Sequence, residues 1–211
     1  MTPLNKPFLL SIDALHFGFP GQALFTNLSA RVSAGMTLIC GGDGCGKTTL
    51  LRLIAGALSP TAGKISINGV DAQSQLAKYQ AQVFWVEPHS ETFDQLTVLE
   101  FFAKQREQFA HFDNPALAQL VGGLDLSAHQ RKRIFMLSTG TKRKVWLAAG
   151  LASNATVTLF DEPFAALDGP SISFLTTWLK NSSEVTSCAW IVAACSAPVG
   201  VSLASMIDLG S

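Results

Sequence analysis

Short runs of apolar residues alternate along this chain with longer segments in which apolar residues recur every three or four positions. The short runs have the length of β-strands, and the longer segments have the period of α-helices. Such alternation is typical of a largely parallel sheet that is covered by helices on both sides. The pattern therefore predicts an α/β fold.

Individual elements can be placed from the same pattern. A helix over residues 48–57 follows a glycine-rich turn, and Gly56 and Pro60 are expected to end it. A more polar block with helical spacing, between residues 97 and 133, predicts a separate helical lobe. We expect β-strands at residues 8–17, 28–32, 36–40, 64–69, 83–86, 156–160 and 189–195.

The uncharged stretch of residues 185–207 admits two interpretations. It is long enough to span a bilayer as a helix. However, it contains several serines as well as Pro198 and Gly200, and its apolar density falls after Cys195. We therefore expect a buried strand, a loop and a second short strand rather than a membrane span.

Composition narrows the class of partner. The 211 residues include 15 basic and 15 acidic ones, so the net charge makes no case for binding nucleic acid or an anionic membrane surface. Hydrophobic residues make up 48% of the chain and charged residues 14%. This balance fits a subunit that hides surface against a partner, and it equally fits a chain with a large buried parallel sheet.

The cysteines and the N-terminal segment indicate an intracellular protein. The four cysteines have neither the spacing of a zinc site nor that of a disulfide framework, so we expect reduced thiols. Residues 1–17 lack the charged and long apolar regions of a secretory signal.

A glycine-rich turn, here called the phosphate turn, carries the clearest chemistry. It matches the pattern G-x-x-x-x-G-K-[ST] between a predicted strand and a predicted helix. Glycines let successive backbone N–H groups face phosphate oxygens, and the helix start adds partial positive charge. We expect Lys47 to reach the β- and γ-phosphates of a nucleoside triphosphate, and the Thr48 hydroxyl to ligate Mg²⁺. The turn consists of Gly41, Gly42, Asp43, Gly44, Cys45, Gly46, Lys47 and Thr48.

Two acidic residues follow the apolar strand expected at residues 156–160. Asp161 at the end of this strand is expected to complete the Mg²⁺ site with Thr48. Glu162, one residue further on, is a candidate general base that would polarise an attacking water. Such a pair is weak evidence alone, but beside the phosphate turn it predicts a site for nucleotide hydrolysis.

Residues 137–144, with the sequence LSTGTKRK, narrow the class of nucleotide-binding protein. They precede an apolar helix, and they resemble the L-S-G-G-Q signature of ATP-binding cassette (ABC) ATPases. The resemblance covers essentially the whole chain, because residues 61–70 and 161–168 also match the family pattern. It implies a P-loop cassette with a mostly parallel core sheet, N-terminal antiparallel strands and a helical subdomain. The single cassette, residues 1–211, would have its nucleotide-binding core at about 1–88 and 137–211 and its helical subdomain at about 89–136.

The same resemblance implies a function. It predicts an ATP-hydrolysing motor subunit of a membrane transporter, held at the inner face of the cell membrane by separate membrane-spanning subunits. The chain is most similar to short single-cassette subunits such as the haem-exporter ATPase of cytochrome c maturation. Two cassettes would close head-to-tail over ATP and Mg²⁺, with Ser138 and Gly140 contacting the γ-phosphate held by the other subunit. Outside the phosphate turn, the expected nucleotide contacts are Phe19, Thr49, Ser138, Gly140, Asp168 and Cys195.

The signature itself departs from the family pattern at two positions. Thr139 and Thr141 replace its second glycine and its glutamine. Little harm is expected, because Ser138 and Gly140 remain.

Two further departures bear on hydrolysis. The family's glutamine after the strand at 83–86 is not evident, and spacing leaves open whether Glu87, Pro88 or His89 stands in its place. Cys195 occupies the position of the family's switch histidine, and a thiol cannot donate to the γ-phosphate as an imidazole does. We therefore expect hydrolysis to be slow.

Two alternatives remain open at this stage. The chain could be a regulatory scaffold that closes on ATP with very weak hydrolysis; the departures favour this reading and Glu162 opposes it.

Four apolar residues after the strand at 83–86 could receive a helix of the membrane subunit or simply pack the helical lobe. These residues are Phe93, Leu96, Phe101 and Phe102.

Overall fold

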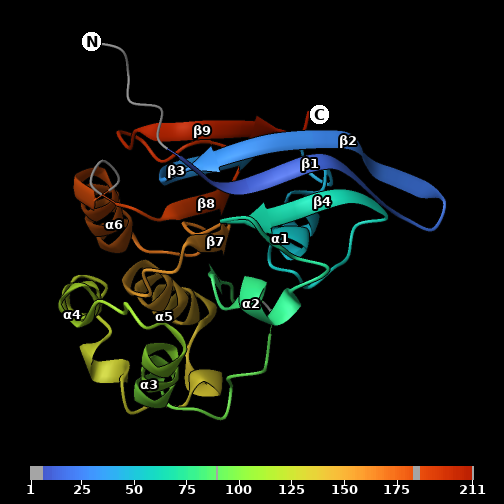
Figure 1. Ribbon diagram of the computed structural model, residues 1–211. Coiled ribbons are helices and arrows are strands. Elements are labelled where there is room, and N and C mark those ends of the chain that lie inside the picture. The colour runs from blue at the N-terminus through green and yellow to red at the C-terminus, as the bar shows by residue number, and fades with distance from the viewer. Residues whose placement is uncertain (1–6, 89, 183–185, 211) are drawn as a thin grey trace.

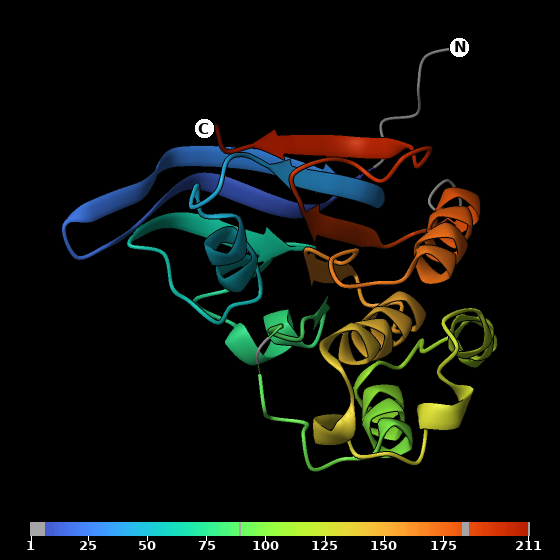
Figure 2. The ribbon, with the colours of Figure 1, turned by 180° about the vertical axis from the view of Figure 1, so that it is seen from behind.

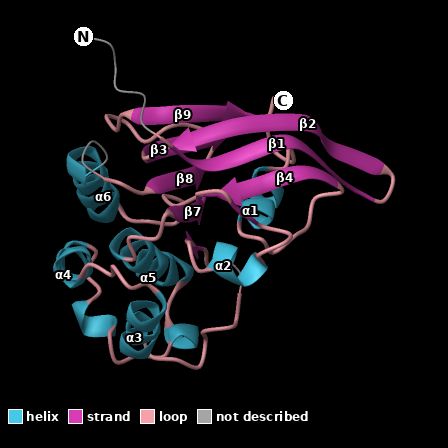
Figure 3. Ribbon diagram, viewed as in Figure 1, coloured by secondary structure: helices cyan, strands magenta, loops and turns pink. Residues whose placement is uncertain are grey.

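The computed structural model describes residues 7–88, 90–182 and 186–210. It has two sheets with helices around them (Figures 1 and 3). One sheet has five parallel strands in the order β6-β7-β8-β3-β9, and the other has four antiparallel strands in the order β2-β1-β4-β5. The α/β class, with its parallel core and N-terminal antiparallel strands, is confirmed.

The elements follow one another along the chain in the following order and with the following bounds. The strands are β1 (Phe8–Phe19), β2 (Gln22–Ser33), β3 (Gly35–Cys40), β4 (Ala62–Ile67), β5 (Val70–Asp71), β6 (Val83–Phe84), β7 (Val157–Asp161), β8 (Ala189–Ala193) and β9 (Leu203–Asp208). The α-helices are α1 (Lys47–Ile54), α2 (Leu76–Gln80), α3 (Val98–Gln108), α4 (Asn114–Gly123), α5 (Thr139–Ala152) and α6 (Gly169–Ser182), with single 3₁₀ turns at Ser127–His129 and Ile134–Met136.

The parallel sheet separates two hydrophobic clusters. Successive side chains of a strand point to opposite faces, so Leu38 of β3 and Phe160 of β7 join one cluster. Their neighbours Ile39 and Leu159 join the other, which also contains the buried face of α1 and the inner side of β1 and β4. Helix α1 therefore lies between the two sheets, and its N-terminus is fixed at the end of β3.

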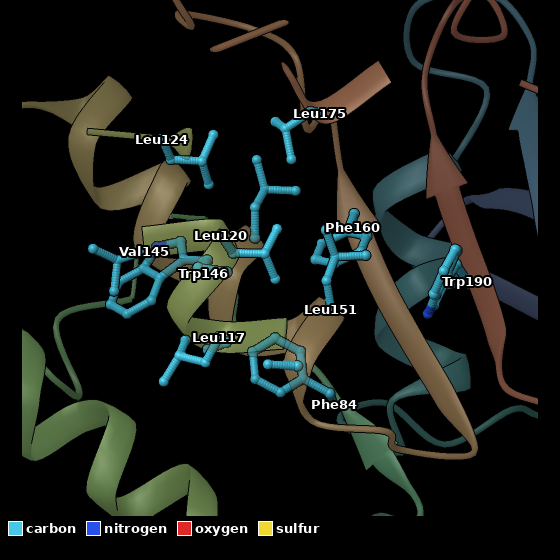
Figure 4. Packing of buried hydrophobic residues seen from close by; sticks show 14 of the residues in the cluster. Phe84, Leu117, Leu120, Leu124, Val145, Trp146, Leu151, Phe160, Leu175 and Trp190 are labelled. Carbon is cyan, nitrogen blue, oxygen red and sulfur yellow. The ribbon is translucent and has the colours of Figure 1, made fainter. Parts of the chain in front are cut away.

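Helix α5 covers the other face of the parallel sheet. Residues 145–152 are all buried, and Trp146 and Leu151 lie in the cluster that Phe84 and Phe160 join from the strand side (Figure 4). Burial of a large apolar side chain typically contributes about 1.5–3 kcal/mol. Helices α3 and α4 pack beside α5 at the opposite end of the molecule from β9 (Figure 2).

Local capping explains where the helices of this lobe begin. The Thr97 hydroxyl accepts from the backbone N–H of Glu100 at 3.2 Å, and the Glu100 carboxylate accepts from the Thr97 N–H at 2.7 Å. This reciprocal arrangement satisfies two donors that the first helical turn leaves unpaired. Asp113 caps α4 in a similar way, accepting from the N–H of Ala116 at 2.8 Å. The helical character predicted for residues 97–133 is confirmed.

Some expected elements have different bounds. The strand predicted at 83–86 is limited to Val83–Phe84, because the following residues leave the sheet edge toward α1 and the helical lobe. Helix α1 ends at Ile54, three residues earlier than predicted, where Gly56 adopts a left-handed conformation with φ of 68°. Helices α2 and α6 were not predicted, since α2 is a single short turn and α6 buries only Ser171, Leu175 and Leu179.

The uncharged stretch contains two strands. Within its described part, residues 186–207, a fully buried β8 and a half-exposed β9 are joined by a loop. Both strands pair in parallel with β3. No helix among the described residues has both the length and the apolar character needed to cross a bilayer. The strand–loop–strand expectation is confirmed.

The apolar residues after β6 serve mainly to pack the lobe. Phe101 and Phe102 are fully buried, so they are not free to receive a partner, and that interpretation of them is wrong. Phe93 is half-buried and meets the ring of Phe101 edge-on at 5.0 Å and that of Trp146 at 6.1 Å. Leu96 is also half-buried against the same cluster.

A buried tyrosine joins α2 to the end of α1. The Tyr79 hydroxyl donates to the carbonyl of Ile54 at 2.7 Å, and burial raises the pKa of this phenol. This carbonyl belongs to the last turn of α1, where no helical partner is available. The hydrogen bond therefore anchors the C-terminal end of the helix that begins at the phosphate turn.

Tyr79→Phe is expected to lower the free energy of unfolding by about 1–3 kcal/mol, because the Ile54 carbonyl stays buried without a donor. Urea denaturation measures this change. Gln80→Ala is the matched control, since the Gln80 amide donates to the Gly56 carbonyl at 3.3 Å but is solvent-exposed. A loss below about 0.5 kcal/mol for Tyr79→Phe, as expected of the control, contradicts the anchoring role.

Candidate active site

The phosphate turn lies between β3 and α1 in a conformation that needs its glycines. Gly41, Gly44 and Gly46 have φ values of 147°, 76° and 101°. A Cβ at Gly41 would lie 2.7 Å from the backbone carbonyl oxygen of Gly210, and one at Gly46 would lie 2.8 Å from Leu24 Cδ2. Backbone conformation therefore disfavours a side chain at both positions, and at Gly41 the nearby backbone also leaves no space for one.

Lys47 folds back over this turn. Its ammonium donates to the carbonyls of Gly41 and Gly42, at 2.9 Å each. The cation is therefore held at the mouth of the turn, next to backbone N–H groups at the start of α1. This arrangement of positive charge around a side-chain-free cradle fits a polyphosphate group.

Thr48 and Asp161 meet across the sheet edge. The Thr48 hydroxyl, on the first turn of α1, donates to Asp161 Oδ2 at the end of β7 at 2.7 Å. The sequence separates these residues by more than a hundred positions, and the fold joins them because the carboxyl ends of parallel strands share one edge. A hydroxyl beside a carboxylate is an oxygen donor set that fits Mg²⁺.

Glu162 is fixed in a special backbone conformation. Its φ of 46° lies in the left-handed region, and its N–H donates to the carbonyl of Ala193 at 2.8 Å. This bond joins the end of β7 to the end of β8, two residues before Cys195. The fold thus brings the segments of Glu162 and Cys195 together, and the Cys195 side chain is exposed to solvent.

Phe19 lies at the end of the β1–β2 hairpin. Its ring is 49% exposed and meets Phe17 edge-on at 5.3 Å. The hairpin borders a shallow cavity of about 360 Å³ that includes His16 and Thr61. Since β2 also supplies Leu24 against Gly46, the hairpin extends beside the phosphate turn. An exposed aromatic face here is suited to stacking on a nucleobase.

The remaining residues predicted in and after the turn have less distinctive surroundings. Asp43 is exposed, while Cys45 and Thr49 are half-buried. Cys45 is a free thiol whose sulfur fills the space beside Gly41. Its small size suits the tight turn, in line with the packing role expected for it.

Ser138 and Gly140 lie at the N-terminus of α5. The Ser138 hydroxyl accepts from the N–H of Thr141 at 3.2 Å, so this serine is the N-cap. A Cβ on Gly140 would collide with the carbonyl of Ala166, and Arg143 donates to the carbonyl of Ala165. The start of α5 is therefore fastened to the loop that follows Glu162.

Asp168 is engaged within its own chain. Its carboxylate accepts from the backbone N–H of Ser171 at 2.8 Å and from the ammonium of Lys144 at 2.5 Å. The hydrogen bond from Lys144 and those from Ser171 hold the pKa of Asp168 well below its usual range. Asp168 therefore caps α6 and ties it to α5, a role that its place in the sequence did not reveal.

Glu87 has a partner that sequence reasoning missed. Three residues after β6, its carboxylate forms an ion pair with Arg52 of α1. Pro88 borders a cavity of about 410 Å³ that Asp161 and Lys142 also line. His89 lies outside the described residues. The one feature of the sequence that relates Arg52 to the site is its position four residues after Thr48, on the same side of the helix.

The predicted residues thus form two groups. The first group lies at the carboxyl ends of β3, β7 and β8. It consists of Lys47, Thr48, Asp161, Glu162 and the segment of Cys195. Ser138, Gly140 and Asp168 gather instead around the N-terminus of α5 and the loop before α6.

Comparison with known proteins is consistent with this site. The family described as ABC transporter matches residues 25–165. The cytochrome c biogenesis ATP-binding export protein CcmA of Pseudomonas savastanoi pv. phaseolicola is 34% identical over 182 residues, which cover 86% of this chain and 85% of that protein. The taurine import ATP-binding protein TauB of Pseudomonas fluorescens is 31% identical over 169 residues, covering 76% and 61% respectively. A solved ATP-binding subunit of an ABC transporter has a TM-score of 0.78 at 23% identity, covering 88% of this chain and 79% of its own.

Proposed function

The chain belongs to the family of ABC transporter ATP-binding subunits, and from this premise we propose that it binds and hydrolyses MgATP as the motor subunit of a membrane transporter. The hydrogen bond of 2.7 Å between Thr48 and Asp161, beside the ammonium of Lys47, carries the proposal. It pairs the two oxygen donors that a nucleotide-bound Mg²⁺ requires with a cation for its phosphates.

Each residue of the site has a distinct task in this proposal. Lys47 exchanges its two carbonyl partners for the β- and γ-phosphate oxygens when ATP enters the turn. Thr48 and Asp161 hold Mg²⁺, directly and through water, and the bound ion supplies charge neutralisation at the phosphates. Glu162 accepts the proton of the attacking water as general base. Phe19 stacks against the base, and Asp43, Cys45 and Thr49 line the phosphate turn and its helix.

The second group of residues serves a partner cassette. Ser138 and Gly140 present a helix N-terminus, where backbone N–H groups favour an anion. We place the γ-phosphate of a second cassette there, so that two chains close head-to-tail over two nucleotides. Because similar relatives are named both as export and as import proteins, the proposal covers the motor and not the transport direction.

Coupling to the membrane requires separate subunits in this proposal. The chain acts at the inner face of the cell membrane through membrane-spanning partners, and residues 89–136 form the helical subdomain that transmits closure to them. The decisive experiment isolates the chain with its partners from solubilised membranes and measures MgATP turnover in the assembled complex. Nucleotide-dependent turnover that needs Glu162 supports the motor function, and a complex that binds ATP without turnover contradicts it.

A second candidate function is a regulatory cassette that closes on ATP with very weak hydrolysis. The observation that favours it is the exposed thiol of Cys195 just beyond β8, next to the strand end that Glu162 joins. A thiol there offers no strong donor to the developing charge on the γ-phosphate.

Cys195→His separates these two functions. In a weakly hydrolysing cassette, an imidazole at this position is expected to raise MgATP turnover by about a hundredfold, because one donor to developing charge is regained. The affinity for ATP should change far less. Steady-state phosphate release is measured, with Cys188→Ser at a buried thiol as the control for cysteine removal. An unchanged rate means that another group orients the water.

A further inference from the structure

An ion pair connects the phosphate-binding helix to the segment that leaves the sheet after β6. Arg52 lies four residues after Thr48 on α1, and its guanidinium contacts the carboxylate of Glu87. Both side chains are about 40% exposed, with values of 41% and 40%. Arg52 is the basic residue of the last turn of α1.

This ion pair bears on the proposed nucleotide site because of where Glu87 lies. Strand β6 is the parallel neighbour of β7, and both strands end at the sheet edge where Asp161 meets Thr48. Val86 and Pro88, on either side of Glu87, line the same cavity as Asp161. Arg52 lies four residues after Thr48 on α1, a rise of about 6 Å along the helix axis, so the ion pair fastens the Glu87 segment to the phosphate-binding helix one turn beyond Thr48.

A carboxylate without a partner at this place would act against the nucleotide. With Mg²⁺ at Thr48 and Asp161, as proposed, the outermost phosphate of a bound triphosphate would lie nearest that edge, and like charges repel appreciably in a partly desolvated site. A diphosphate lacks that group, so its binding should be less sensitive to the same charge.

We infer that Arg52 is a positioning residue that neutralises Glu87 and thereby lets this chain accept a carboxylate beside its triphosphate site. The inference rests on the proposed function, since it assumes that ATP occupies the phosphate turn. It also gives Arg52 a defined role, since an arginine on the phosphate-binding helix compensates the negative charge of Glu87.

The test compares a non-hydrolysable β,γ-imido ATP analogue with ADP, both with Mg²⁺, by calorimetry on the full chain. Arg52→Gln is expected to weaken the ATP analogue by about tenfold and ADP by less than about twofold. Arg52→Lys, which keeps the charge, should stay within about twofold for both nucleotides. A merely structural role for Arg52 would weaken both nucleotides alike.

Glu87→Gln supplies the rescue. Added to Arg52→Gln, it should restore the affinity for the ATP analogue to within about twofold of the unmodified protein, because no charge is left to neutralise. Arg31→Gln is the matched control, since Arg31 forms a comparable exposed ion pair with Asp13 on the antiparallel sheet. It should change neither affinity.

The outcomes separate a failure of the proposed function from a failure of the inference about Arg52. If the unmodified chain binds neither nucleotide, the proposed function fails and the inference falls with it. If the unmodified chain binds both, but Arg52→Gln weakens them equally or not at all, the inference alone is overturned. A selective loss of affinity for the ATP analogue that Glu87→Gln does not rescue also overturns it, because the effect then does not pass through that carboxylate.

Discussion

Lys47→Ala is expected to abolish measurable MgATP binding. In the structure the Lys47 ammonium makes two hydrogen bonds to carbonyls of the phosphate turn, each 2.9 Å long. When ATP binds, these become two charge-assisted bonds to phosphate oxygens, and such bonds typically contribute about 1.5–3 kcal/mol each. Their combined loss corresponds to a weakening of at least about a hundredfold, which places the affinity beyond the range of calorimetry.

Titration of MgATP into the purified variant measures this loss. Lys64→Ala is the matched control, because Lys64 is an exposed lysine on β4, away from the phosphate turn. Thermal unfolding in the absence of nucleotide shows whether the variant keeps its fold, since Lys47 also bridges two carbonyls of the turn. Unchanged ATP affinity in a folded variant would contradict the assignment of the phosphate turn as the ATP-binding site.

Local sequence patterns were sufficient for the parts of the site that depend on neighbouring residues. The phosphate turn requires glycines, a lysine and a threonine in one continuous segment between a strand and a helix. The sequence displays that whole arrangement, so its place in the fold was predictable. The pairing of Thr48 with Asp161 was also predictable, since Asp161 ends one parallel strand, Thr48 follows the turn after another, and the ends of parallel strands share an edge.

Other contacts depend on side-chain directions that a linear pattern does not contain. Helical spacing places Phe101 and Phe102 on the same face as the buried Val98 and leaves Leu99 off it, but the pattern does not tell whether that face packs inside the lobe or receives a partner. The Arg52–Glu87 pair likewise joins a helix to a segment that leaves the sheet irregularly. Asp168 was expected to face a nucleotide, yet its carboxylate is used to cap α6 and to bind Lys144.

These internal contacts also suggest how the two groups of site residues are related. Glu162 is bonded through its backbone to β8, and the loop after it is fastened to the start of α5 by the contacts of Arg143 and Gly140. A displacement of the acidic end of β7 would therefore also displace Ser138 at the start of α5. In the proposed dimer, the residue that activates water and the helix end that binds the partner's phosphate belong to one connected unit.

Glu162→Gln probes this unit and is expected to have the second large effect. The amide keeps the shape of the side chain but cannot accept a proton, and loss of a general base typically slows a reaction by about 10²–10⁴-fold. MgATP binding should be retained, because Lys47, Thr48 and Asp161 are unchanged. With the membrane partner present, the variant should accumulate as a closed pair of cassettes on MgATP, since the step that would reopen the pair is blocked.

Phosphate release measures the rate, and sedimentation of the complex with saturating MgATP measures the pairing. Glu107→Gln, at an exposed carboxylate of α3, is the control and should alter neither quantity. A turnover within about tenfold of the unmodified protein would assign the general base to another residue. Cassettes that stay unpaired under these conditions would contradict the role of Ser138 and Gly140, because a retained ATP would then have no second subunit closing over it.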